Sequence, residues 1–82
     1  MMAPRIDEWR GFAIRINTHD HGPPHVHVVN ADVDLRVYLD DMHAPKIVKG
    51  SMRVNDLRAV VRYVCQNRDR YLERWKEIDP LP

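Results

Sequence analysis

The chain has 82 residues, of which 44% are hydrophobic and 30% are charged, and thirteen basic residues nearly balance twelve acidic ones. This length allows one domain, residues 1–82, with an ordered core from about 8 to 78. A domain of this size buries only about 60–65% of the surface that its unfolded chain exposes. The composition excludes a disordered chain, and a net charge of +1 provides no global basic field for nucleic acid or anionic membrane.

Cysteine content and the absence of long apolar stretches set the expected compartment. Cys65 is the only cysteine, so neither an internal disulfide nor a thiolate zinc cluster can form. The first residues lack the apolar core of a signal peptide, and no stretch approaches eighteen apolar residues. These features predict a cytoplasmic protein that does not contact a membrane.

The first half of the chain alternates with the period of β-strands. Residues 11–17 alternate, and a second strand is expected from His25, after a loop that contains Gly22 and two prolines. The clearest alternation runs from Val33 to Asp40 and predicts a third strand. A short strand at 46–49 would have to lie at a sheet edge.

The second half has the period of a helix. Apolar residues recur at spacings of three, four or their sums: Val54, Leu57, Val61, Val64, Leu72, Trp75 and Ile78, with Val60 and Tyr71 beside them. This spacing predicts one long helix that ends near Asp79, and it places Cys65 at the border of the buried stripe. The predicted fold is α+β: a small antiparallel sheet of three or four strands with one long C-terminal helix packed on one face.

If the helix covers the aliphatic face of the sheet, alternation places a polar set on the opposite, open face. The set consists of Arg15, Asn17, His25, His27, Asp34, Arg36 and Tyr38. A two-residue turn at Asn30-Ala31, or a four-residue turn over 29–32, would pair His27 with Asp34 and His25 with Arg36. Asp34 would then orient His27, and the two imidazoles would be suited to donate and to accept a proton.

One stretch carries a family resemblance. The run HGPPHVHV at 21–28, with Leu39-Asp40, Asp56-Leu57-Arg58, Asn67-Arg68 and Trp75, resembles a small bacterial family catalogued as domain of unknown function 4160, over roughly residues 10 to 78. The resemblance implies no established biochemistry. Members are often encoded beside another short gene, which implies a toxin–antitoxin-like module and a small protein partner. The imidazole motif corresponds to His21, His25 and His27.

Three interpretations of the histidines remain open. His19, His21, His25 and His27 are suitable ligands for zinc, nickel or copper. His25 and His27 could instead act as acid and base in a nuclease, with Arg15 or Arg36 stabilising the phosphorane charge. Alternatively, the histidines hold the Pro-Pro turn, and no chemistry takes place there.

The helix carries a second candidate surface. Arg58 and Arg62 lie four residues apart, a like-charge pair that phosphate or an acidic partner would satisfy, although a solvated face also explains it. The leading interpretation is a binding component that docks a protein partner or nucleic acid on the open sheet face or a sheet edge, with a homodimer also open. The competing interpretation is the nuclease that uses His25 and His27.

Overall fold

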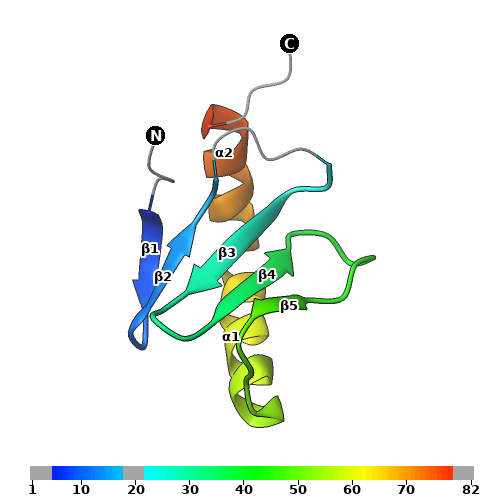
Figure 1. Ribbon diagram of the computed structural model, residues 1–82. Helices are drawn as coiled ribbons and strands as arrows, with labels where there is room; N and C mark the ends of the chain where they lie inside the picture. The colour runs from blue at the N-terminus through cyan, green and yellow to red at the C-terminus, as the bar shows by residue number, and fades with distance from the viewer. Residues whose placement is uncertain (1–4, 18–21, 79–82) are drawn as a thin grey trace.

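The computed structural model describes residues 5–17 and 22–78, which form an α+β fold of one antiparallel sheet and two C-terminal helices (Figure 1). The strands pair in chain order β1-β2-β3-β4-β5. The elements are β1 (Arg5–Trp9), β2 (Phe12–Arg15), β3 (His25–Val29), β4 (Asp34–Tyr38), β5 (Lys46–Lys49), α1 (Val54–Gln66) and α2 (Arg68–Ile78). The short strand at 46–49 is therefore confirmed, and it is an edge strand.

Strand β1 is an addition to the three or four strands expected. It pairs with β2 through a two-residue turn, in which Arg10 has φ 48° and Gly11 has φ 82°. Two positive φ values in succession define a type I′ turn, the geometry that matches the twist of a hairpin. Gly11 is typical of the second central position of such a turn, but arginine is unusual at the first central position. The sequence pattern therefore did not predict this hairpin.

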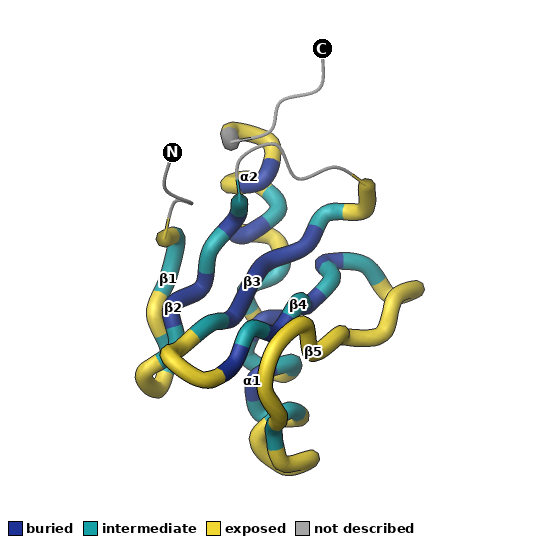
Figure 2. The backbone as a smooth tube through the Cα atoms, viewed as in Figure 1, coloured by how far each residue is buried: buried dark blue, intermediate teal, exposed yellow. Residues whose placement is uncertain are grey.

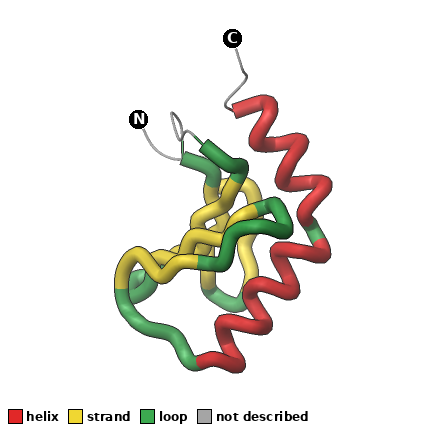
Figure 3. The backbone as a smooth tube through the Cα atoms, turned by 90° about the vertical axis from the view of Figure 1, so that its right-hand side faces the viewer, coloured by secondary structure: helices red, strands yellow, loops and turns green. Residues whose placement is uncertain are grey.

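The single long helix expected at 54–78 is two helices, separated at Asn67 (Figure 3). Asn67 has φ −111° and ψ 13°, and its side-chain Nδ2 donates to the Tyr63 carbonyl at 2.8 Å. Its Oδ1 accepts a hydrogen bond from Arg70 Nη2 at 2.9 Å. Asparagine side chains compete with helical hydrogen bonds in this way, and the break occurs there because of that competition.

The helices cover the aliphatic face of the sheet, as the pattern predicted (Figures 2 and 3). The buried core consists of Ile14, Ile16, Val26, Val28, Val33, Leu35, Val37, Leu39, Val60, Val64, Tyr71 and Trp75. The stripe on the helices is displaced from the expected one: Val60 and Tyr71 are fully buried, whereas Leu57, Val61 and Leu72 are only partly buried. The break at Asn67 changes the helical phase of α2 relative to α1, so it bears on Tyr71 and Leu72. Within α1, the buried side of the helix follows Val60 and Val64.

The register between β3 and β4 differs by two residues from the prediction. His27 is paired with Arg36 and His25 with Tyr38, instead of with Asp34 and Arg36. The side chain of Asn30 sets this register, because its Oδ1 accepts the backbone N–H groups of Asp32 and Val33 at 2.8 Å each. A shift of two residues keeps every side chain on its predicted face.

The edge strand β1 is anchored to the helices through Asp7. Its Oδ2 accepts hydrogen bonds from Tyr63 Oη at 2.8 Å and from Tyr71 Oη and Arg70 Nη2, both at 2.7 Å. Burial raises the pKa of Asp7, but these hydrogen bonds outweigh burial and hold that pKa below its ordinary value of 3.8. Burial and the hydrogen bond to Asp7 raise the pKa of Tyr71. The pattern of apolar residues gave no sign of this cluster.

Among the helices of the described residues, none combines the length and the apolar character needed to cross a membrane.

Candidate functional site

The predicted polar face forms rows across the sheet. Arg15 of β2, His27 of β3 and Arg36 of β4 are paired in register, and the pairing continues from Arg36 to Lys46 of β5. The next row pairs His25 with Tyr38. Alternation therefore assigned these residues to one face correctly.

His25 is held by a hydrogen bond and by aromatic contacts. Its Nδ1–H donates to the Pro23 carbonyl at 2.9 Å, which fixes the start of β3 after the two prolines. Its ring lies 5.2 Å from that of Trp75 and 5.6 Å from that of Tyr38, measured between centroids. Tyr38 in turn contacts His43 at 4.9 Å, so a row of four rings links α2 to the loop after β4. His43 was not among the predicted site residues.

His27 meets Asp34 in spite of the shifted register. Its Nδ1–H donates to Asp34 Oδ1 at 3.2 Å, and Asp34 belongs to the neighbouring pair, opposite Val29. The contact is therefore diagonal, which the reach of an imidazole and a carboxylate allows. The expectation that Asp34 orients His27 is confirmed, but the proposed place of Arg36 opposite His25 is wrong.

The two imidazoles are buried instead of lying on an open surface. His25 is 3% exposed and His27 is 6% exposed, and their rings touch each other at a centroid distance of 5.2 Å. The flanking Arg15 and Arg36 are partly buried, and the Nε atom of each is inaccessible to solvent. The rings of Tyr38 and of Trp75 in α2 lie against His25, so this face is not open as the alternation pattern alone presents it.

The described residues hold only two of the four histidines proposed as metal ligands, His25 and His27. Within residues 5–17 and 22–78, no three side chains of histidine, cysteine, aspartate or glutamate converge on a point where an ion could bind. His19 and His21 lie outside the described residues, so the proposed four-histidine set is not tested. The Nδ1 atoms of His25 and His27 are hydrogen-bonded to the Pro23 carbonyl and to Asp34, and these bonds fix the orientation of each ring.

The helical arginines are separate from the histidines. Arg58 and Arg62 are exposed on α1, which packs against the aliphatic face of the sheet. Arg62 borders a small hollow together with Trp9, Arg10 and Tyr63. Cys65, expected at the border of the buried stripe, is exposed, because the buried stripe of α1 follows Val60 and Val64.

The most accessible part of the sheet is β5. All four of its residues are exposed, including Ile47 at 37% and Val48 at 49%, and the preceding residues 41–45 are exposed as well. Of the described strands, only β4 pairs with it. Its outer edge therefore presents backbone groups, and its two faces carry the aliphatic side chains of Ile47 and Val48.

Comparison with known proteins gives a family and nothing finer. A family model described as a domain of unknown function, DUF4160, matches residues 11–76. No curated protein and no solved structure matches the chain. Because the family model spans well over half of the sequence, the chain belongs to the DUF4160 family.

Proposed function

We propose that this DUF4160 member acts by binding, as one component of a toxin–antitoxin-like two-gene module, and that its partner adds a strand to β5. The single observation that carries the proposal is the accessibility of β5: every residue is exposed, and among the described strands β4 alone pairs with it, on one side. An added strand would gain main-chain hydrogen bonds along this edge, and Ile47 and Val48 would supply apolar contact.

The charges on β5 favour a different chain over a second copy. The strand reads KIVK, so antiparallel pairing of two β5 strands in register would place Lys46 opposite Lys49 twice. Like charges directly opposed destabilise a strand pair, and edge lysines discourage self-association. An acidic strand avoids this repulsion. The expected partner is therefore the small protein encoded by the neighbouring gene, with acidic residues at its docking strand.

Titration calorimetry with the neighbouring gene product tests this proposal. The Val48→Glu substitution adds a charge on the docking edge, and we expect it to weaken the complex at least tenfold, about 1.4 kcal/mol. Val54→Glu is the matched control, because Val54 is also exposed but begins α1. Equal weakening by both variants, or no complex with the unmodified protein, would exclude β5 as the docking edge.

The nuclease alternative has weaker support, because His25 is 3% exposed and His27 is 6% exposed, which restricts the access of a substrate to both rings. A general acid and base must reach the substrate within hydrogen-bond distance. Incubation of the untagged protein with total RNA, beside a His27→Gln variant that circular dichroism shows to be folded, tests this alternative. RNA cleavage that the variant loses would replace the binding proposal with the nuclease.

A further inference from the structure

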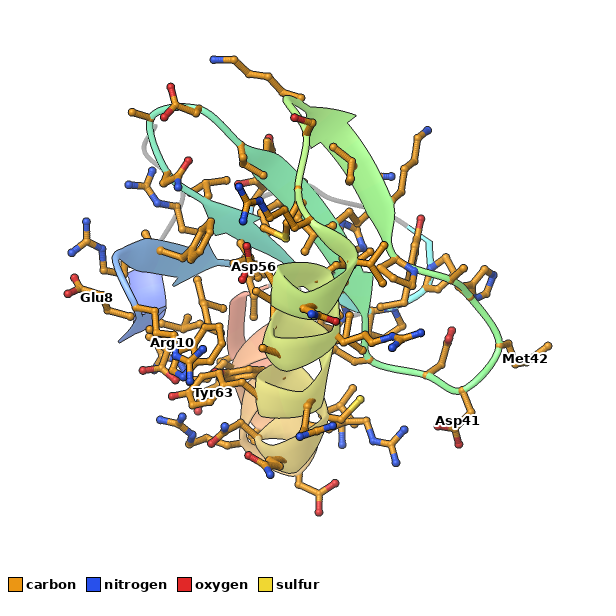
Figure 4. All side chains as sticks on the ribbon, turned by 90° about the horizontal axis from the view of Figure 1, so that it is seen from below. Glu8, Arg10, Asp41, Met42, Asp56 and Tyr63 are labelled. Carbon is orange, nitrogen blue, oxygen red and sulfur yellow. The ribbon has the colours of Figure 1, made fainter. Side chains whose placement is uncertain are left out.

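An open groove of about 500 Å³ lies between the β1–β2 hairpin and the first turns of α1, on the side of the molecule seen in Figure 4. Its apolar lining consists of Trp9, Phe12, Val33, Met52, Ala59 and Val60. Four polar residues complete it: Arg10, Ser51, Arg53 and Asp56. The volume lies within the range of pockets that bind small molecules, and so does the combination of apolar walls with a few polar groups.

Arg10 is held at this groove at a conformational cost. Its φ of 48° lies in the left-handed region, which is strained for a residue other than glycine. The guanidinium carbon lies 4.5 Å from the centroid of the Trp9 ring, and Trp9 stacks on Tyr63 with a centroid distance of 4.9 Å and an interplanar angle of 17°. The stack fixes the cation beside the apolar lining, instead of leaving it free in solvent.

The charges around the groove are unbalanced. Within the described residues, neither Arg10 nor Arg53 forms an ion pair, and Asp56 is the one carboxylate that borders the groove. Arg62 adds a further cation at the adjoining hollow, which shares Trp9 and Arg10 with the groove. Three arginines around one carboxylate favour an anion over a cation or a neutral ligand.

We propose that the groove binds a small organic anion with an aromatic or branched aliphatic body. The body packs against Trp9, Phe12 and Met52, and a carboxylate lies between Arg10 and Arg53. The guanidinium groups provide planar donors that match a carboxylate, and the apolar contact contributes most of the free energy of binding. No residue of β5 lines the groove, and the site does not depend on the partner proposed above.

Nuclear magnetic resonance titration with two probes of equal shape tests the charge requirement. 4-Phenylbutyrate and 4-phenylbutylamine share a phenylalkyl body and differ in the sign of their charge. We expect the butyrate to shift the Trp9 indole N–H signal and the Ala59 and Val60 amide signals saturably, with a smaller response to the amine. An equal or larger response to the amine, or no response to the butyrate up to about 10 mM, would overturn the proposal.

A matched pair of charge reversals tests the position of the site. Arg53→Glu places an acid at the start of α1, where the helix dipole favours it, so the fold should persist. We expect it to weaken 4-phenylbutyrate binding at least tenfold. Arg58→Glu makes the same change on the same helix outside the groove and should leave the affinity unchanged. Equal effects of the two variants would overturn the proposal. Contact of the neighbouring gene product with the groove, without any response to the butyrate, would also overturn it.

Discussion

The two edge strands of the sheet differ in how they are held. β1 is fixed to both helices, through Asp7 and through the stacking of Trp9 on Tyr63. Every residue of β5 is exposed, and among the described strands only β4 pairs with it. Each of these strands pairs with one described neighbour, but β1 is held in place by side-chain contacts with the helices, whereas β5 is exposed along its whole length. This asymmetry is the reason for proposing β5 over β1 as the docking edge.

The largest expected effect comes from removing the anchor of β1. Asp7→Ala leaves the buried Tyr71 hydroxyl and Arg70 without their acceptor, and we expect it to lower the free energy of unfolding by about 3 kcal/mol, measured by urea denaturation. Asp41→Ala is the control, because Asp41 also pairs with an arginine at 2.7 Å but is 88% exposed. That exposed pair should contribute far less than the Asp7 cluster. Equal losses would remove the distinction between the two edges.

Acid should weaken the same anchor. Because the pKa of Asp7 in the folded protein lies below its ordinary value of 3.8, its contribution to stability is fully present above that value. The contribution is lost as the pH falls through the lowered pKa. Thermal unfolding followed from pH 5 to pH 2 should therefore show a steeper loss of stability below about pH 4 in the unmodified protein than in Asp7→Asn. Identical profiles would contradict the assignment.

A smaller effect is expected at Asp34 of β4, the strand on the inner side of β5. Asp34 lies opposite Lys49 of β5 and accepts a hydrogen bond from His27. Asp34→Asn removes the negative charge but keeps the shape of the side chain, and we expect it to cost about 1 kcal/mol in urea denaturation. Asp32→Asn is the control, since the Asp32 side chain is exposed in the turn. A cost as small as that of the control would mean that the His27 contact adds nothing to stability.

The smallest effect is expected on β5 itself. Ile47→Ala should cost less than about 1 kcal/mol, because the side chain already has 37% of its surface exposed. Its partner in register, Leu35, is fully buried, and Leu35→Ala should cost about 2–5 kcal/mol. A large loss from Ile47→Ala would show that β5 is a structural edge, and the contrast with β1 would disappear.

Sequence periodicity predicted the layers of this fold and the face of each strand, because both follow directly from backbone geometry. It did not predict the register of β3 and β4, which one asparagine sets, nor the helix break, which another asparagine causes. The burial of His25 and His27 could not be predicted either, since it depends on side chains from neighbouring strands and from α2. Asp7 was missed because its partners lie more than fifty positions away in the chain.

The strained turn at Arg10 has a consequence for anyone who engineers this chain. Glycine or asparagine tolerates the left-handed region better than arginine, so a stability-guided redesign would replace Arg10 among its first choices, with a gain of about 1 kcal/mol. The same replacement would delete the guanidinium stacked on Trp9. A more stable version of the protein would then lack a cation of its groove, and selection for thermal tolerance alone would favour losing it.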